Sequence, residues 1–504
     1  MLERAFCACL LVAVLAASRV DAGPDTDTAT TIIVNASIVD GTGAPARRGA
    51  IRIAGDRIAA VGEVEPAAGE RVVDAAGLTL VPGFIDTHSH HDRGLFEARE
   101  ALAAVSQGIT TIVAGQDGSM TWPVGELFEQ QRKTPVAINV ASYVGHGDIR
   151  QRVMGEDFRR QATTGEIERM RTLVRAGMEA GALGLSTGLE YDPGIYSTTE
   201  ELIELAKEAA RYGGRYVSHI RSEDRYEWQA LDEIVRIGRE AKIPVQVSHM
   251  KLGMIDWWGQ SSRFIGVLDR ARAEGIDITG DVYPYEYWQS DLSVLFPERD
   301  FSRHSSAEFA LQHVAPADGL LITNYPPEPE LAGLTIAQIA ARKGMTPVDT
   351  LMELTTRSQT ARVEDSVIGT SMRSDDIAAL IAWPHANICS DGSLAGRHPR
   401  GAGAFTKVLR VYVREQKLLS LEQAVHKMTG LAAAHIGIGD RGVIRAGAFA
   451  DLVLMDPEQV ADRSTIMEPQ VQSVGIHKVW VNGVIVLDEG AATGAYPGQA
   501  VRRP

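Results

Sequence analysis

Eight short apolar segments alternate with amphipathic helical patterns between residues 82 and 440, and this alternation restricts the possible folds more than any other feature. In order, the segments are FIDTHSH, TTIVAG, VAINVASYV, ALGLST, YVSHIRS, VQVSHMK, DITGDVYPY and ANICSDG. Helical patterns such as TTEELIELAKEAARYG and ALDEIVRIGREAK lie between several of them. Repeated βα units of this kind indicate a parallel sheet covered by helices. Eight units predict an α/β fold, a (β/α)8 TIM barrel over residues 83–440.

Both ends of the chain have a different pattern, in which Val- and Ile-rich segments are broken by glycines, as is typical of antiparallel strands. The N-terminal segments are TIIVNASIVDG, GAIRIAGDRIAAVG and RVVDAAGLTLVPG. The pattern returns near the C-terminus in GVIRAGAFADLVLMD and VGIHKVWVNGVIVLDEG. We therefore predict that residues 23–82 and 441–504 pair into one small β-sandwich domain.

A long segment interrupts the barrel pattern before its last strand. Residues 285–385 separate the last two predicted strands, whereas connections in βα units are usually much shorter. We predict that this insertion forms a lid or a wall of the substrate pocket.

The composition is that of a globular protein with a large core, because 45% of the residues are hydrophobic and 23% are charged. This excludes a disordered or collagen-like chain. Fifty Lys and Arg residues against 65 Asp and Glu residues give a net charge of −15. Such a balance repels polyanions, so the sequence predicts no nucleic-acid partner.

Residues 1–22 have the pattern of a secretory signal peptide. The apolar run CACLLVAVLAA is too short to span a bilayer as a helix, and Val20 and Ala22 supply the small residues of a cleavage site before Gly23. The sequence therefore predicts a secreted or periplasmic protein without an integral membrane span after cleavage. An uncleaved N-terminal anchor is the alternative, since the charged start is weak. Cleavage would leave Cys389 as the single cysteine, which excludes an internal disulfide.

Histidines stand at the ends of the predicted barrel strands, where barrel enzymes hold their catalytic groups. His88 and His90, in DTHSHHD, are two positions apart, so both side chains leave the same face of a strand and can bind one cation. A lone histidine there is more often structural, but an alternate pair favours metal binding. His219 in YVSHIRSE and His249 in VQVSHMK are 30 residues apart, about one βα unit, which predicts neighbouring imidazoles.

Asp391, in NICSDGS, ends the last predicted strand. A carboxylate at this position can hold a metal-bound water and take its proton. The alternative is an aspartate that caps a turn or helix before Gly392. The catalytic interpretation is favoured, because four histidines stand at the ends of earlier predicted strands.

The order HxH, His, His and Asp on eight predicted strands resembles the amidohydrolase superfamily of metal-dependent hydrolases. Longer motifs are similar to those of the N-acyl-D-amino-acid deacylase (D-aminoacylase) family, namely GALGLSTGLEYDPGIYSTTEEL, YVSHIRSE, VSHMK, DVYPY and CSDGS. The resemblance covers nearly all of residues 31–490, and the β-rich chain ends fit that family's composite sandwich. Five motifs in the right order are a strong signal.

This resemblance implies one or two Zn²⁺ ions and a zinc-bound hydroxide that attacks the amide carbonyl of a small N-acyl-D-amino acid. It implies that Asp391 binds metal and, as general base and acid, passes the proton to the leaving amine. Zinc lowers the pKa of its bound water to about 7 and polarises the carbonyl, so no Ser or Cys nucleophile is needed. The preference for D-substrates rests on the resemblance alone.

The chain departs from the family at two ligand positions. Where the deacylases commonly read GNCG after the second strand, with Cys as a ligand, this chain reads GQDG, so Asp117 stands in place of the thiolate. A carboxylate is a harder zinc ligand, which predicts weaker binding or a different metal. Asp117 as a turn residue between glycines is the alternative.

The second departure concerns the bridge between two metals. Many relatives use a carboxylated Lys on the fourth strand, but no Lys occurs between Lys133 and Lys207. Glu190, just past that strand, is the candidate bridge, and a solvent-facing loop carboxylate is the alternative.

An anionic substrate needs a cation, which an acidic protein must place locally. The resemblance points to Lys251 in VSHMK, Tyr283 in DVYPY and Arg397 in GRHPR, each of which could also be an ordinary surface group. Tyr191, beside Glu190, is a further substrate-binding candidate. His146, at the end of the third strand, could polarise the carbonyl oxygen. Arg299, in the insertion, could reach an acidic substrate side chain.

Three alternative functions stay open. A dihydropyrimidinase or hydantoinase would use the same scaffold, but the missing strand-four Lys argues against cyclic amides. A dipeptidase that accepts D-residues also cleaves an amide next to a carboxylate, and the sequence does not separate it from a deacylase. A non-catalytic scaffold is disfavoured, because all four histidines and Asp391 are present.

Overall fold

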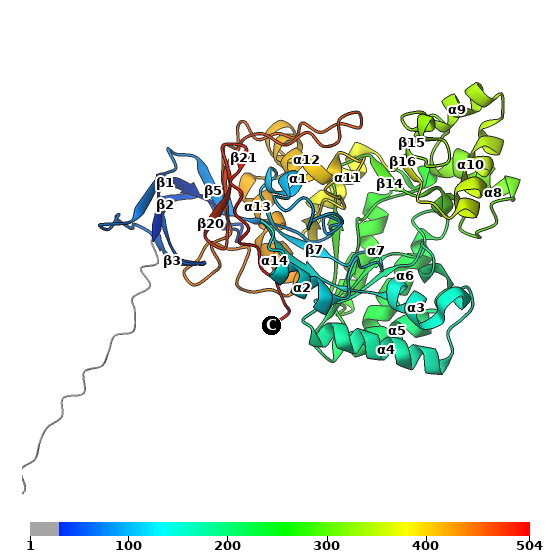
Figure 1. Cartoon of the computed structure of the whole chain (residues 1–504), viewed down its shortest axis with the longest axis horizontal. Coiled ribbons are helices and arrows are strands. Elements are labelled where there is room, and N and C mark those ends of the chain that lie inside the picture. The colour runs from blue at the N-terminus through cyan, green and yellow to red at the C-terminus, as the bar shows by residue number, and fades with distance from the viewer. Residues whose placement is uncertain (1–29) are drawn as a thin grey trace, which may run out of the picture.

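The eight apolar segments form a barrel of parallel strands in a computed structural model that describes residues 30–504 (Figure 1). The predicted signal peptide, residues 1–22, lies outside the described residues. The barrel strands are β6 (Phe84–Asp86), β7 (Ile109–Ala114), β8 (Asn139–Ser142) with β9 (Val144–Gly145), β10 (Gly184–Gly188), β11 (Arg215–His219), β12 (Val245–Val247), β13 (Ile278–Val282) and β17 (Ala386–Ile388). The predicted fold class is confirmed.

Two hydrogen-bonded runs make up the barrel. Their strand orders are β6-β7-β8 and β17-β13-β12-β11-β10-β9, with every pair parallel. Backbone bonds join β17 to β6 just beyond their ends: the Asp391 N–H donates to the His88 carbonyl at 2.9 Å, and the His90 N–H donates to the Gly392 carbonyl at 2.8 Å. The last strand therefore meets the first at the point where the predicted functional residues emerge.

Helices surround the barrel because their apolar residues recur at helical spacing and face the strands. They are α1 (Leu102–Val105), α2 (Val124–Lys133), α3 (His146–Met154), α4 (Thr164–Glu179), α5 (Thr199–Ala210), α6 (Glu227–Ala241), α7 (Ser261–Ala273), α11 (Ser374–Ala382), α12 (Arg400–Lys407), α13 (Leu421–Met428) and α14 (Gly430–Ile436). In α6, for example, Leu231, Ile234 and Ile237 are buried toward the strands. Thr163 caps α4 in a capping box with Glu166, which satisfies otherwise orphaned backbone N–H groups.

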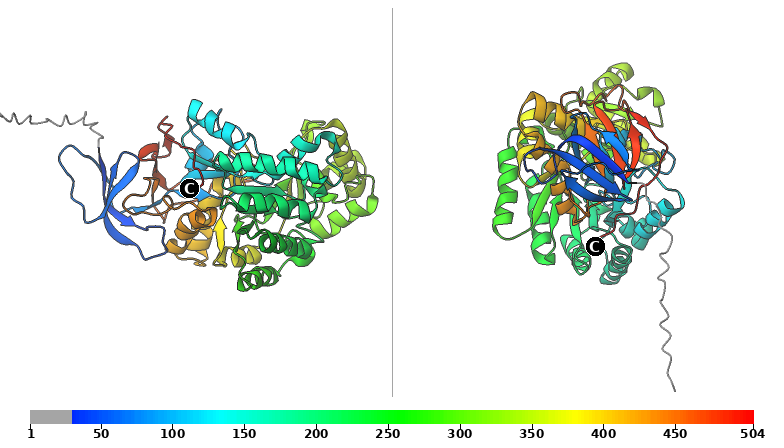
Figure 2. Two further views of the ribbon diagram at one scale, coloured as in Figure 1. Left: turned by 90° about the horizontal axis from the view of Figure 1, so that it is seen from below. Right: turned by 90° about the vertical axis from the view of Figure 1, so that its left-hand side faces the viewer.

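Strands from both chain ends share one sheet of nine strands, with the order β21-β20-β19-β18-β5-β1-β2-β3 and β4 paired with β1. The bounds are β1 (Thr31–Ile38), β2 (Arg47–Ala54), β3 (Arg57–Gly62), β4 (Arg71–Asp74), β5 (Thr79–Pro82), β18 (Leu452–Met455), β19 (Ile476–Val481), β20 (Val484–Asp488) and β21 (Ala491–Ala492). The ends meet where β5 pairs antiparallel with β18. Figure 2 shows these strands side by side at one end of the barrel.

Hydrogen bonds connect all nine strands, so the chain ends do not form two separate sheets. The reason lies in β1, whose first half pairs with β4 and whose last residues pair with β5. Its pairing with β2 is irregular between Ile33 and Ala36, where Asn35 has a φ of 57°. Such a bulge bends a strand and lets one sheet curl over its own core. That core includes Ile51, Leu80 and Trp480.

The insertion has a sheet and a hydrophobic core of its own. Its antiparallel sheet has the order β14-β16-β15, and three α-helices complete the unit; the elements are β14 (Tyr287–Ser290), β15 (Leu320–Asn324), β16 (Ser366–Thr370), α8 (His304–Phe309), α9 (Ile336–Lys343) and α10 (Pro347–Ala361). Helix α11 fell within the predicted insertion, but it packs against β13 and β17 as a barrel helix. In Figures 1 and 2 the insertion lies at the opposite end of the barrel from the nine-stranded sheet.

Within residues 30–504, no helix is both long and apolar enough to cross a membrane.

Candidate metal centre

Six predicted functional residues meet at the carboxyl edge of the barrel. His88 and His90 follow β6, Asp117 follows β7, His219 ends β11, His249 follows β12 and Asp391 follows β17. They meet because parallel barrel strands all end at the same edge. The sequence therefore placed these side chains on the correct elements, and the structure brings them together as three-dimensional neighbours.

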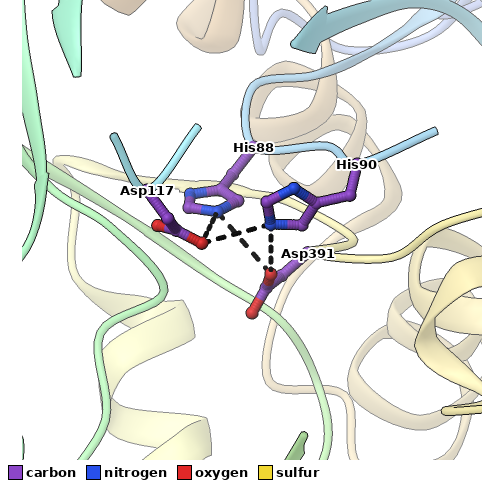
Figure 3. A group of neighbouring side chains, drawn as sticks. All are labelled: His88, His90, Asp117 and Asp391. Carbon is purple, nitrogen blue, oxygen red and sulfur yellow. Dashed lines mark hydrogen bonds and ion pairs between the residues drawn. The ribbon is translucent and has the colours of Figure 1, made fainter. Parts of the chain in front are cut away.

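A first group joins His88, His90, Asp117 and Asp391 (Figure 3). The Nε2 atoms of His88 and His90 lie 3.3 Å and 3.1 Å from Oδ2 of Asp117. The same two nitrogens lie 3.6 Å and 3.4 Å from Oδ1 of Asp391. Two imidazole nitrogens and two carboxylate oxygens thus face one another around one position.

A second group joins Asp117, His219 and His249. Nδ1 of His219 lies 3.0 Å from Nε2 of His249, and that Nε2 lies 3.4 Å from Oδ1 of Asp117. Asp117 therefore presents Oδ2 to the first group and Oδ1 to the second. It is the residue that both groups share.

The donor set fits a metal ion such as zinc. Imidazole nitrogens and carboxylate oxygens are zinc ligands, and a carboxylate can bind two ions through its two oxygens. Oδ1 of Asp117 is buried and has no hydrogen-bond partner among the described residues, although buried polar atoms are almost always paired. A ligand for this oxygen is therefore expected on physical grounds.

Backbone conformation supports the same conclusion. Asp117, His249 and Asp391 have φ angles of 53°, 34° and 49°, in the left-handed region that non-glycine residues rarely adopt. Such strained positions cluster at functional sites, where the surrounding structure holds them in place. The strained turn at Asp117 therefore directs its carboxylate between the two histidine groups.

Glu190 was predicted as the bridge between two metals, and the structure places it elsewhere. Its Oε2 lies 3.0 Å from Nε2 of His219, whereas Nδ1 is the ring nitrogen that faces the second group. Glu190 is buried, so it is not a solvent-facing loop residue either. Asp117 occupies the shared position, because its two carboxylate oxygens face the two groups, whereas Glu190 contacts His219 at the ring nitrogen on the other side.

Glu223 was missed by the sequence analysis. It follows His219 by four residues, and its Oε1 lies 3.1 Å from Nδ1 of His249. Both of its oxygens also accept hydrogen bonds from Nζ of Lys251 at 2.8 Å. The acidic residue in the motif YVSHIRSE was the available signal.

Arg400, rather than the predicted Arg397, is the arginine at the centre. Arg397 is exposed and does not line the cavity, whereas Arg400 is buried and its NH1 lies 2.7 Å from Oδ2 of Asp391. Burial alone would raise the pKa of Asp391, but Arg400 and the imidazole of His249 hold it well below its usual range. Asp391 is therefore ionised. Arg400 is carried inward as the first residue of α12.

Three predicted substrate-binding residues do line the cavity, namely Lys251, Tyr283 and Tyr191. Burial would lower the pKa of Lys251, but the neighbouring Glu223 carboxylate raises it, which keeps the ammonium charged. The Tyr283 hydroxyl is buried without a hydrogen-bond partner among the described residues. The Tyr191 hydroxyl lies 3.2 Å from Nδ1 of His219.

Two further candidates point away from the cavity. His146, the first residue of α3, is buried and its Nε2 lies 2.9 Å from Oε1 of Glu201, so it does not reach a substrate carbonyl. Arg299 donates to Asp192 at 3.0 Å and to the backbone carbonyls of Ser293, Phe296 and Glu190. Its donors are thus engaged by the protein, and it is not among the cavity residues.

The centre opens into a cavity of about 670 Å³, large enough for a small molecule. One wall comes from the barrel and carries the metal groups with Lys251 and Arg400. The other wall comes from the insertion, and its lining residues include Trp288, Asp291, Leu295, Glu364 and Asp365. No Lys, Arg or His from the insertion lines the cavity in the part of the chain that the structure describes.

Comparisons with known proteins agree with this arrangement. The sequence profile of the Amidohydrolase family matches residues 71–487. The chain is 36% identical to a D-aminoacylase of Alcaligenes xylosoxydans xylosoxydans, with 94% of this chain and 97% of the relative aligned. It is 37% identical to an N-acyl-D-aspartate deacylase of the same organism, over 93% of this chain and 94% of the relative.

A solved structure is similar over the same length. The N-acyl-D-glutamate deacylase of Bordetella bronchiseptica, complexed with zinc and a phosphonate mimic of the tetrahedral intermediate, superimposes with a TM-score of 0.84 and 36% identity. The match covers 94% of this chain and 99% of that chain. The chain therefore belongs to the amidohydrolase family, within its N-acyl-D-amino-acid deacylase (D-aminoacylase) group.

Proposed function

We propose that this protein is a zinc-dependent hydrolase that cleaves the amide bond of N-acyl-D-amino acids and releases a D-amino acid and a carboxylate. The observation that carries the proposal is the position of Asp117, which joins two histidine groups opposite Asp391 in a cavity with two buried cations. The three relatives described above are named as deacylases of D-amino acids, and one holds zinc with a tetrahedral-intermediate mimic.

The two histidine groups and Asp117 would hold one or two zinc ions. Zinc, when bound, lowers the pKa of a coordinated water and polarises a carbonyl oxygen. Asp391 accepts the proton of the attacking water and later donates it to the nitrogen of the leaving amine. Arg400 keeps Asp391 ionised before the reaction and orients it through the contact at 2.7 Å.

Lys251, Tyr283 and Arg400 form the binding site for the substrate carboxylate. Lys251 and Arg400 both lie over the Tyr283 ring, at 5.8 Å and 4.8 Å from its centroid. Tyr283 adds a buried hydroxyl that has no partner within the described chain. Charge-assisted hydrogen bonds from these groups would fix the substrate so that its amide faces the metal groups.

The substrate partner is a small N-acyl amino acid, and the acidic net charge of −15 argues against nucleic acid. The signal-peptide pattern of residues 1–22 supports export to the periplasm or the medium, where small peptides and acylated amino acids are accessible substrates.

The test compares release of amine from N-acetyl-D-methionine and N-acetyl-L-methionine by the purified protein. We expect D-selective hydrolysis that Asp391→Asn slows by about 10²- to 10⁴-fold while circular dichroism shows an unchanged fold. Equal rates on both enantiomers would overturn the stereochemical assignment, and wild-type turnover by the Asp391→Asn variant would overturn the mechanism.

A dipeptidase that cleaves before a D-residue is the second candidate, and the insertion wall favours it. Asp291, Glu364 and Asp365 line this wall without a basic partner from the insertion, which suits the ammonium of an aminoacyl group. Rates on L-Ala-D-Met and N-acetyl-D-methionine separate the two functions. A higher kcat/KM on the dipeptide would assign the dipeptidase, and a higher value on the acetyl compound would assign the deacylase.

A further inference from the structure

The two histidines of the second metal group have carboxylates on their outer sides. Oε2 of Glu190 lies 3.0 Å from Nε2 of His219, and Oε1 of Glu223 lies 3.1 Å from Nδ1 of His249. In each imidazole the other nitrogen faces Asp117 and the neighbouring histidine. The carboxylates therefore meet the ring nitrogens that a metal between the two histidines would leave free.

The first group lacks this arrangement. Nδ1 of His88 has no hydrogen-bond partner among the described residues, and the nearest carboxylate oxygen there, Oδ2 of Asp281, lies 3.9 Å away. His90 is partly exposed, with 17% of its side chain accessible, against 4% for His219 and 2% for His249. The outer carboxylates are thus a specific property of the second group.

The contact between Glu190 and His219 has the geometry of a hydrogen bond. A neutral imidazole carries its proton on one nitrogen, and a carboxylate is an acceptor only. Glu190 therefore favours the tautomer with the proton on Nε2 and the lone pair on Nδ1.

Glu190 is itself held in place. It is 7% exposed, and its Oε1 accepts the backbone N–H of Glu223 at 3.4 Å. Arg299 donates to the Glu190 carbonyl and so fixes the loop that carries it. A carboxylate fixed in this way orients the ring that it contacts, which is how outer carboxylates act on metal-binding histidines.

Glu190, His219 and Glu223 also lie close enough to form a third metal group, but the surrounding charges oppose it. Both oxygens of Glu223 lie 2.8 Å from the ammonium of Lys251. A metal ion at this place would compete with that ammonium for the same oxygens and would lie beside a like charge. The contacts fit hydrogen bonding better than coordination.

We propose that Glu190 is a positioning residue, which orients His219 and holds the proton on Nε2, the ring nitrogen that faces away from Asp117. Glu223 acts differently, because Nδ1 of His249 also lies 2.7 Å from the Lys251 ammonium, which can only donate. Glu223 holds that ammonium and so connects the metal group to the site of the substrate carboxylate. This inference rests on the proposed metal-dependent function, but it concerns metal affinity and not the choice of substrate.

The test uses Glu190, because replacing Glu223 would also release Lys251. Zn²⁺ is titrated into the chelator-treated protein against a colorimetric chelator, and both affinity and stoichiometry are measured. Glu190→Leu removes the acceptor, and we expect zinc affinity at the tightest site to fall by about 10- to 100-fold, the usual effect of losing an outer partner. Glu190→Gln keeps an acceptor oxygen, so we expect it to recover most of that affinity with an unchanged number of bound ions.

Glu227→Gln is the matched control. Glu227 is another fully buried carboxyl near Glu223, but its oxygens contact no imidazole and make no hydrogen bond with described residues. We expect it to leave zinc affinity unchanged. Unchanged affinity in Glu190→Leu would overturn the inference, and so would a lost ion in Glu190→Gln, since that would identify Glu190 as a ligand. Failure of the wild-type protein to bind zinc would overturn the proposed function instead.

Discussion

The two walls of the cavity differ in burial and in how their charges are compensated. On the barrel wall the charged groups beside the metal centre are buried in pairs, as in the contacts of Lys251 with Glu223 and of Arg400 with Asp391. On the insertion wall the carboxylates of Asp291 and Glu364 are partly or fully exposed, and no basic residue of the insertion lines the cavity among the described residues. We therefore expect the barrel to perform the chemistry and the insertion to influence the choice of substrate.

The largest effect is expected from His219→Ala on the barrel wall. This change removes an imidazole from the second metal group and leaves the carboxylate of Glu190 without its partner. We expect amine release to fall to the level of chelator-treated wild-type protein, with bound zinc reduced in the same sample. Wild-type turnover by this variant would contradict the assignment of catalysis to the barrel residues.

Asp391→Asn should come next. The amide is nearly isosteric but does not accept the proton of the attacking water, so kcat on N-acetyl-D-methionine should fall by about 10²- to 10⁴-fold, the range of general acid–base catalysis. Zinc at the second group should remain bound, because Asp391 belongs only to the first group. Loss of all zinc would show that Asp391 acts mainly as a ligand.

Lys251→Met tests the substrate carboxylate site. Removing one charge-assisted hydrogen bond should lower kcat/KM by about 10- to 150-fold, which corresponds to about 1.5–3 kcal/mol. The decisive comparison uses the amide of N-acetyl-D-methionine, which has no carboxylate. The variant should lose its preference for the acid over the amide. A retained preference would show that Lys251 does not bind the substrate carboxylate.

The smallest effect is expected on the insertion wall. The double variant Asp291→Asn and Glu364→Gln removes two cavity carboxylates. We expect up to about a fivefold rise in kcat/KM on N-acetyl-D-glutamate relative to N-acetyl-D-methionine, since exposed charges contribute a few tenths of a kcal/mol each, or about 1 kcal/mol for the two together. Glu330→Gln, an exposed insertion residue outside the cavity, is the control. No change in this ratio would mean that the insertion wall does not sense substrate charge.

The sequence predicted the features that depend on strand periodicity. The βα repeats give the barrel, and a residue at the end of an apolar strand must emerge at its carboxyl edge. This is why the positions of His88, His90, His219, His249 and Asp391 at that edge followed from the sequence.

The errors arose where a loop decides the direction of a side chain. Glu190 and Asp117 both follow strands, but only the strained turn at Asp117 reaches between the histidine groups. Arg397 and Arg400 are three residues apart, and the start of α12 buries the second of them. His146 begins α3 and turns toward Glu201. Tertiary packing, which strand periodicity does not encode, determines these directions.

The most direct test of the account is the zinc content of the purified wild-type protein, measured together with hydrolysis of N-acetyl-D-methionine before and after chelation. We expect one or two zinc ions per chain, activity that chelation removes and activity that returns when zinc is added. A protein that binds no metal, or that hydrolyses the substrate equally well after chelation, would contradict the assignment of Asp117 and the four histidines to a catalytic metal centre.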